Sequence, residues 1–465
     1  MKRLALLAAL AAAGCTTVGP DYERPELPLP AAYPQAPAAA AEPLAPEWWK
    51  RFGDATLDGL VAAARAANSD LRLAAARVEE AEALAREAGA AFYPEVLAGA
   101  SGTRSRVSRE TEPPAGAPLE RTSYQALAST SFEIDFWGRY ARTAEAARAN
   151  LLGARYAHAL VDLSLAGAVA QGYFALRALD AQLKVLDETI RVRADSLAIA
   201  RARLGAGLAG ELDVYQAQAA LAEAQVQRRE AARVRALAER QLAVLTGRLE
   251  LRLPPAAPGR DLLALPVPPA PPAGLPSALL ERRPDIRAAE QQLAGANALI
   301  GAARAALFPS ISLTGALGGQ SAELSDLLSS GARIWSLGFG LTLPIFDGGR
   351  RTARVEQAEA RRAQALAAYQ RSVENGFREV ADALVSLEQS AASESELRAR
   401  LEAARSALEL STVRYESGYS AYLEVLDAQR TANDAELALV RNRQARLAYS
   451  VDLMKALGGG WAAAD

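Results

Sequence analysis

Two stretches of the chain repeat one another and decide the fold. One reads Arg414-Tyr-Glu-Ser-Gly-Tyr-Ser-Ala-Tyr-Leu-Glu-Val-Leu-Asp-Ala-Gln429, and the other, about 211 residues earlier, reads Arg203-Leu-Gly-Ala-Gly-Leu-Ala-Gly-Glu-Leu-Asp-Val-Tyr-Gln-Ala-Gln218. Each contains a glycine, Gly207 or Gly418, where a helix would end and the chain would turn back. A helical hairpin repeated at this spacing indicates a duplicated architecture.

Long helical patterns surround both turns. Segments 140–246 and 350–457 contain no proline and are each expected to form a long helical hairpin. The first helix of each hairpin would have roughly 65 residues and a length of about 100 Å at 1.5 Å per residue. Helices of globular proteins are far shorter on average, so an extended array of helices is expected.

Before each helical hairpin the apolar period changes to two, which is typical of β-strands. The expected strands cover about 93–106 and 121–136 in the first copy, and 309–319 and 332–346 in the second. Segments of this length suit tilted strands that cross a membrane. Four strands cannot close a barrel, and an open edge in lipid leaves backbone groups unpaired. The chain must therefore oligomerise if these strands lie in a membrane; a soluble sheet packed on the helices is the alternative.

The N-terminus has the features of an exported lipoprotein. Residues 1–14 combine a positive start, a short apolar run and small residues, as in a secretory signal peptide. The only cysteine, Cys15, follows Ala-Gly, as in bacterial lipoproteins, whose new N-terminal cysteine carries diacylglycerol and an N-acyl chain such as palmitate. Ala12 departs from the usual leucine, so an incidental cysteine in an ordinary exported protein is the alternative. Thr16, which is not aspartate, favours the outer membrane by analogy.

These signals divide the chain into six parts. They are the signal peptide 1–14, a lipidated Pro-rich strap 15–54, a first structural repeat 55–250, a Pro-rich linker 251–284, a second structural repeat 285–457 and a tail 458–465. After the leader no run reaches the 18 to 20 apolar residues of a transmembrane helix. Only the strands are therefore expected to cross a bilayer.

Composition argues against enzymes and against nucleic-acid binding. The net charge is −2, with no basic excess to attract nucleic acid. His158 is the only histidine, so His/Cys metal sites and Cys–His pairs are excluded. The run Gly205-Ala-Gly-Leu-Ala-Gly210 matches a dinucleotide fingerprint, but it follows a helix where that motif requires a strand. We therefore expect no enzyme activity and no cofactor besides the lipid of Cys15.

Four stretches, one of them overlapping the second helical turn, resemble one protein family. They are Cys15-Thr-Thr-Val-Gly-Pro-Asp-Tyr22, Gly274-Leu-Pro-Ser-Ala-Leu-Leu-Glu-Arg-Arg-Pro-Asp-Ile-Arg-Ala-Ala-Glu290, Pro344-Ile-Phe-Asp-Gly-Gly-Arg350 and Tyr422-Leu-Glu-Val-Leu-Asp-Ala-Gln-Arg430. Together they make the chain similar to the TolC-like outer membrane factors, the outer-membrane channels of tripartite efflux pumps, in their OprM/NodT-like lipoprotein subgroup. The resemblance covers essentially all of the mature chain.

The resemblance implies a mixed α and β membrane protein. Three copies would form a twelve-stranded β-barrel continued by a twelve-helix α-barrel, lipid-anchored in the outer membrane of a Gram-negative bacterium and extending into the periplasm. This homotrimer would be a passive channel, opened at its periplasmic end by a periplasmic adaptor (membrane fusion) protein and fed by an inner-membrane RND pump. The alternatives are a periplasmic coiled-coil lipoprotein scaffold and the outer channel of a type I secretion system. The cargo is not indicated.

The same resemblance implies a closure at the helical turns. By motif match, Leu423 and Asp427 would line a hydrophobic and an acidic ring, with Arg430 one turn further on and able to restrain Asp427. The first copy has Gln216 where the second has Asp427, so the ring would hold three carboxylates. A solvated helix charge is the alternative for Asp427.

A latch between the hairpins is also implied. Arg414 and Tyr415 would tie the inner hairpin to its neighbour, with Glu211 or Asp213 as the acceptor. Opening would be an iris-like untwisting of the inner hairpins. Exposed charge pairs are individually weak, so several would have to act together.

Overall fold

The computed structural model describes residues 17–30, 33, 44–108, 110, 118–256, 261–271, 277 and 279–461. The signal peptide and Cys15 lie outside them, as do parts of the strap, the linker and the tail. The described residues form two compact units. Unit 1 draws on Met1–Glu26, Val78–Ala154 and Ala289–Tyr369; unit 2 draws on Leu27–Arg77, Arg155–Ala288 and Gln370–Asp465. One boundary between the units falls in the strap, after Glu26, and the others fall within helices.

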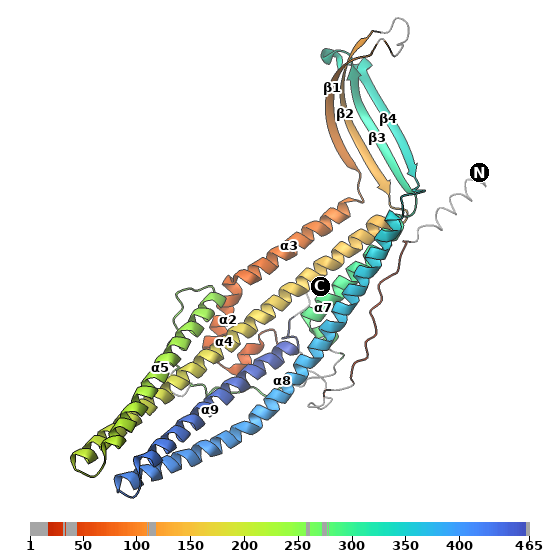
Figure 1. Cartoon of the computed structure of the whole chain (residues 1–465). Helices are drawn as coiled ribbons and strands as arrows, with labels where there is room; N and C mark the ends of the chain where they lie inside the picture. Colours follow the sequence, from red (N-terminus) through yellow and green to blue (C-terminus); the bar gives the residue numbers. More distant parts are fainter. Residues whose placement is uncertain are drawn as a thin grey trace. The chain divides into compact units, whose positions relative to one another are not determined.

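The order of elements repeats (Figure 1). In the first copy the elements are η1 (Trp48–Phe52), α2 (Ala55–Ala67), α3 (Ser69–Ala90), β1 (Glu95–Arg106), β2 (Glu120–Ile134), α4 (Arg139–Gly205) and α5 (Glu211–Leu245). In the second they are α6 (Leu279–Arg282), α7 (Pro284–Ala305), β3 (Ser310–Ser321), η4 (Leu324–Asp326), η5 (Ser330–Ala332), β4 (Arg333–Thr342), α8 (Arg350–Glu416) and α9 (Tyr422–Ala456). Each copy thus has a helix, two strands, a 67-residue helix and a 35-residue helix.

In unit 1 the four strands form one antiparallel sheet in the order β1-β2-β3-β4. The two copies meet where β2 pairs with β3, for example Ala128 with Leu317. The register places the apolar residues of alternate positions on one face of the sheet. This face contains Val96, Ala98, Tyr124, Ala126, Ala128, Phe132, Ile311, Leu313, Leu317, Trp335, Leu337, Phe339 and Leu341.

The strands end earlier than the apolar pattern suggests at two places. The expectation for β2 extends to residue 136, but the strand ends at Ile134 because Phe136 N–H turns back to the Ile134 carbonyl oxygen. The expectation for β4 extends to residue 346, but the strand ends at Thr342. Pro344 lacks the N–H that a continued ladder would require.

Part of the strap packs within unit 1. Val18 N–H donates a hydrogen bond of 3.1 Å to the carbonyl oxygen of Trp137, just after β2. The Arg24 guanidinium makes two hydrogen bonds, of 2.6 and 3.0 Å, to the Glu290 carboxylate on α7. The segment after Cys15 is therefore attached near the end of the strands where β2 leads into α4.

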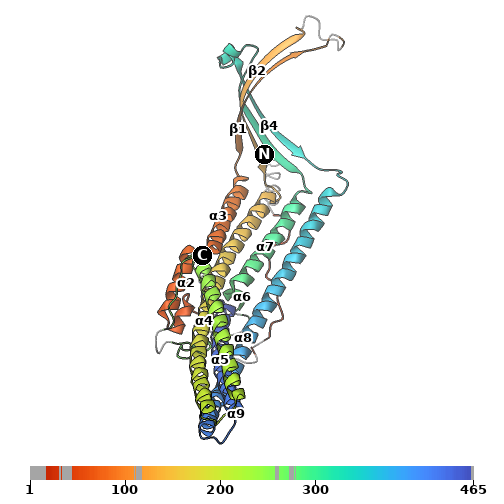
Figure 2. The ribbon, with the colours of Figure 1, turned by 60° about the vertical axis from the view of Figure 1, so that its left-hand side comes forward.

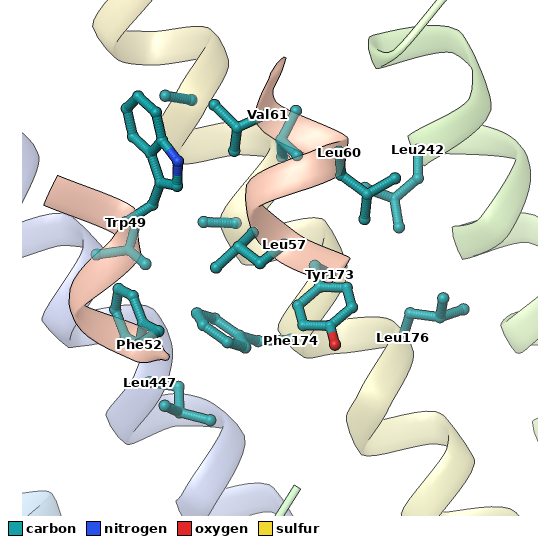
Figure 3. Packing of buried hydrophobic residues seen from close by; sticks show 14 of the residues in the cluster. Trp49, Phe52, Leu57, Leu60, Val61, Tyr173, Phe174, Leu176, Leu242 and Leu447 are labelled. Atoms are coloured by element: carbon teal, nitrogen blue, oxygen red, sulfur yellow. The ribbon is translucent and has the colours of Figure 1, made fainter. Parts of the chain in front are cut away.

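Unit 2 has an aromatic core where η1 and α2 pack on the long helices (Figure 3). Trp49 and Phe52 lie among the aliphatic side chains of α2, and Phe174 of α4 contacts the Phe52 ring at 4.9 Å between centroids. Asp54 caps α2 and accepts a 2.5 Å hydrogen bond from the Tyr173 hydroxyl. Burial, with this hydrogen bond, raises the pKa of Tyr173 to about 12. The aromatic residues at the end of the strap are thus part of the core of unit 2.

Helix α4 bears on the expectation that no segment after the leader is apolar enough to form a transmembrane helix. Of the described helices, α4 has an 18-residue window that is apolar enough to cross a membrane by length and composition. Polar residues interrupt the apolar run in this window, but they lower its mean hydropathy only a little. Half of that window is buried in the protein, and core helices of soluble proteins meet the same criterion. The window is therefore weak evidence for a membrane span.

Candidate functional site: the paired helical turns

The two helical turns lie next to each other in unit 2, where α4–α5 and α8–α9 end together (Figures 1 and 2). Gly207 and Gly418 have positive φ angles of 72° and 83°, a backbone conformation that residues with a Cβ atom rarely adopt. Leu208 N–H bonds to the Arg203 carbonyl oxygen, and Tyr419 N–H bonds to that of Arg414, each at 2.8 Å. Both long helices therefore end in the same Schellman motif, which the repeated glycines predict.

Tyr415 connects the two hairpins. Its hydroxyl donates a 3.3 Å hydrogen bond to the Asp213 carboxylate on α5. Arg203 of α4 donates hydrogen bonds of 3.0 and 3.1 Å to the carbonyl oxygens of Tyr415 and Glu416, with its guanidinium 4.8 Å from the Tyr415 ring centroid. The predicted pair of Tyr415 and Asp213 is therefore in contact, and Arg203 adds a second link.

An apolar cluster lies beneath these links. Tyr415 and Tyr422 have ring centroids 5.4 Å apart and pack with Leu197, Ala217 and Val425 from the two hairpins. Burial raises the pKa of Tyr415, and the neighbouring Asp213 carboxylate raises it further. The phenol therefore remains a hydrogen-bond donor at neutral pH.

Arg414 makes a different contact from the one the resemblance suggests. Its Nε lies 3.2 Å from Glu424 Oε1, within its own hairpin, and both side chains are about half exposed. Among the described residues no ion pair or hydrogen bond involves Glu211, which is exposed. Within this chain Arg414 thus contacts neither Glu211 nor Asp213.

The repeat explains this difference. Arg203 and Arg414 occupy equivalent positions, as do Asp213 and Glu424, but Leu204 stands where the second copy has Tyr415. The extra hydroxyl of Tyr415 bonds to Asp213, and Arg203 reaches across to the Tyr415 backbone. The alignment of the repeats is the signal that could have found Arg203 from sequence.

The proposed ring residues share the exposed side of α9. Leu423, Asp427 and Arg430 are exposed and are spaced four and three residues apart, which places them on one helix face. Arg430 Nη2 lies 2.9 Å from Asp427 Oδ1. The opposite face is buried, and Gln429 donates a 2.8 Å hydrogen bond to Ser196 Oγ of α4. The structure thus brings Asp427 and Arg430 together, with Leu423 one turn before them.

Comparison with known proteins identifies the family. The family model described as "Outer membrane efflux protein" matches residues 60–248 and 275–459. The chain belongs to the outer membrane efflux protein family. This outer membrane efflux protein is 36% identical to the solvent efflux pump outer membrane protein SrpC of Pseudomonas putida, over 99% of this chain and 98% of that one.

Two further comparisons agree. This outer membrane efflux protein is 38% identical to the outer membrane protein OprJ of Pseudomonas aeruginosa, over 98% of this chain and 95% of that one. It resembles the solved open state of the MtrE outer membrane channel of Neisseria gonorrhoeae with a TM-score of 0.83 and 31% identity, over 96% of this chain and 98% of that one.

These comparisons decide between the interpretations of the sequence. The protein is an outer-membrane component of an efflux system of Gram-negative type, with the mixed α and β fold of TolC-like channels. The resemblance inferred from the sequence motifs is confirmed, and the periplasmic scaffold is not the function. The family consists of efflux channels and not of enzymes.

A buried ion cluster further along the same hairpin was not expected from the sequence. Glu394 of α8 accepts hydrogen bonds from Arg398 at 2.7 Å, from Arg446 at 2.6 Å and from Arg443 at 3.2 Å. Arg443 also donates to the carbonyl oxygen of Leu265 in the linker. Burial would raise the pKa of Glu394, but the three guanidinium groups lower it below its ordinary value.

Proposed function

We propose that this outer membrane efflux protein is the exit duct of a tripartite, RND-type pump and that three copies form one passive channel. Twelve strands would form the barrel in the membrane, and twelve helices would form the continuation in the periplasm. The observation that supports this most strongly is the sheet of unit 1. It is open, and its exposed face is apolar.

One chain cannot supply hydrogen-bond partners for the edge strands of the sheet. In the order β1-β2-β3-β4, the outer edges of β1 and β4 have no partner strand among the described residues. On its apolar face Trp335, Leu337 and Phe339 are 76 to 85% exposed. An unpaired edge in hydrocarbon costs several kcal/mol for each unsatisfied group, so neighbouring copies are needed to close the sheet.

The paired turns are suited to close the duct. Leu423 and Asp427 on the exposed face of α9 would form the hydrophobic ring and the three-carboxylate ring. The contacts of Tyr415 with Asp213 and with Arg203 would hold the two hairpins together in the closed state. A relative whose solved structure is called an open state supports a duct with more than one state.

Exposed apolar side chains at the turns support contact with a periplasmic adaptor. Leu208 is 67% exposed and Tyr419 is 80% exposed, each just after its turn glycine. Apolar side chains gathered at a tip are typical of protein contacts. Adaptor binding there would compete with the links between the hairpins and so favour opening. The lipid at Cys15 would anchor the strap in the inner leaflet of the outer membrane.

Native mass spectrometry of the mature protein, released from detergent, tests the assembly. We expect a trimer as the main species. A double substitution of Leu337→Asp and Phe339→Asp on the apolar face should prevent insertion into the outer membrane. The same substitutions at Ser336 and Gly340, on the other face of β4, are the matched control. A monomer as the main species would contradict the proposal.

A further inference from the structure

Three arginines lie on the apolar face of the sheet, at the end where loops join the strands. The register pairs Arg104 of β1 with Thr122, Arg106 with Glu120, and Arg333 of β4 with Gly319. All three share the face of Trp335 and Tyr124 because each is an even number of residues away along the paired strands. Arg104 and Arg106 have side chains that are 76 and 65% exposed.

On β1 and on β4, the arginines lie closer to the loop end of the strand than the nearest aromatic residue on the same face. Tyr124 pairs with Gly102, and Arg104 lies two residues beyond Gly102. On β4, Arg333 lies two residues before Trp335 in the sequence and therefore closer to the loops. Two residues of a strand span about 7 Å. Aromatic side chains mark the level of the membrane interface, so the arginines lie at the level of the lipid head groups.

Among the strand residues on the apolar face at this end, three arginines stand against one carboxylate, that of Glu120. Glu120 lies 2.9 Å from Arg104 and 3.7 Å from Arg106, so one carboxylate faces two guanidinium groups. Among the described residues, Arg333 takes part in no ion pair. Exposed ion pairs of this kind are weak, and guanidinium groups bind phosphate in a bidentate manner. On the apolar face of the strands, this end therefore has an excess of cations suited to phosphate; Glu110, Glu323 and Asp326 lie in the adjoining loops.

The orientation of the sheet follows from the proposed function, and the present inference rests on it. The strap begins at the other end of the strands, because Val18 contacts Trp137 there. Cys15 precedes Val18 by three residues and would be acylated on the periplasmic side. The loop ends of the strands, and with them the arginines, therefore face the outer leaflet.

We propose that Arg104, Arg106 and Arg333 bind the phosphate groups of lipid A, the phosphorylated glycolipid of the outer leaflet of Gram-negative outer membranes. Charge complementarity at the head-group level, beyond an apolar face that contacts acyl chains, supports this partner. The bound glycolipid would fix the height of the sheet in the bilayer. The adjoining Arg121 is on the opposite face of β2 and takes no part.

Native mass spectrometry of the intact mature trimer, with bisphosphorylated lipid A added, tests the proposal. Trimers that carry lipid A are counted for the wild type, for Arg104→Gln combined with Arg106→Gln, and for Arg333→Gln. Arg121→Gln, on the other face of the sheet, is the control and has the same charge change as Arg333→Gln. Glu120→Gln removes the competing carboxylate and leaves the arginines in place. The trimer itself is visible in the same spectra, so a failure of assembly is distinguished from a failure of lipid binding.

We expect the lipid-bound fraction to fall about tenfold in the double variant and less in Arg333→Gln. It should be unchanged in Arg121→Gln and higher in Glu120→Gln. The wild type should bind dephosphorylated lipid A only as weakly as the double variant binds phosphorylated lipid A. Equal binding by wild type and double variant, or by both forms of lipid A, would overturn the proposal. Equal competition by phosphatidylglycerol would overturn the assignment to lipid A.

Discussion

The Arg203 guanidinium lies 4.8 Å from the ring centroid of Tyr415 and donates a 3.0 Å hydrogen bond to the carbonyl oxygen of the same residue. One side chain of the first repeat thus contacts both the ring and the backbone at the end of α8 in the second. Together with the hydrogen bond from Tyr415 to Asp213, it forms the link between the two helical turns.

Removal of this link should loosen the closed state. We expect Arg203→Ala to raise single-channel conductance in planar bilayers, because a hydrogen bond of this kind is worth about 1 kcal/mol and each trimer would lose three sets. Tyr415→Phe, which loses only the hydroxyl, should have a smaller effect in the same direction. Arg201→Ala, an exposed arginine on the same helix, is the control. Conductance no higher than in this control would exclude Arg203 from the gate.

Arg414 should matter less than Arg203. Its ion pair with Glu424 lies within one hairpin and is about half exposed, so it contributes at most about 1 kcal/mol. We predict that Arg414→Ser raises the conductance, but by less than Arg203→Ala does. A larger effect of Arg414→Ser would indicate that Arg414 contacts a neighbouring subunit in the trimer.

The acidic ring makes a separate prediction. Asp427→Ala should raise conductance, because in the proposed trimer it removes three carboxylates and their ion pairs with Arg430 from the proposed closure. Gln216→Ala, at the equivalent position of the first copy, should have little effect. If the two substitutions behave alike, Asp427 is a solvated helix charge.

The Glu394 cluster should make stability depend on pH. The pKa of Glu394 is lower in the folded protein than its ordinary value of 4.5, so the folded state binds this proton less readily than the unfolded chain. Its stabilising effect is present above the unfolded pKa and is lost as the pH falls through the folded pKa. The Tm of the wild type should therefore fall more steeply on acidification, at about pH 4 and below, than that of Glu394→Gln.

At pH 7 the same variant should be less stable than the wild type by roughly 3–5 kcal/mol, because the buried guanidinium group of Arg443 loses its carboxylate partner. Glu396→Gln, two residues away and exposed, is the control. Tryptophan fluorescence during thermal unfolding measures both effects. Parallel pH profiles of the wild type and Glu394→Gln would contradict the assignment.

The lipid at Cys15 should anchor the protein without being required for insertion. A Cys15→Ser protein with a signal peptide of the non-lipoprotein type should still enter the outer membrane and migrate as a heat-modifiable trimer on gels. In the proposed channel the strands and their apolar face supply the membrane contact. A variant that is released in water-soluble form would show that the sheet does not hold the protein in the bilayer.

Local patterns predicted most of the fold. The alternation around Trp335 and Phe339 identified the apolar face of β4, and the repeated glycines identified both turns. The end of β4 was misplaced because the apolar period continues through Ile345 after Pro344 has ended the ladder. Periodicity reports side-chain direction and does not reveal the backbone hydrogen bonds that define a strand.

Contacts between distant segments could be predicted only in part. The pair of Tyr415 and Asp213 came from a family resemblance, whereas the role of Arg203 depends on a single difference between the repeats at Leu204 and Tyr415. The cluster at Glu394 joins α8, α9 and the linker, and nothing in the sequence near Glu394 indicates which helical arginines reach it. Such networks depend on tertiary packing, which a local pattern does not encode.

Single-channel recording of the purified mature protein in planar lipid bilayers tests the central claim most directly. If three copies form a duct that the paired turns close, the wild type will show discrete steps of low conductance. Arg203→Ala combined with Asp427→Ala will show steps several times larger. The absence of discrete steps in both proteins, with the trimer intact by mass, would contradict this account.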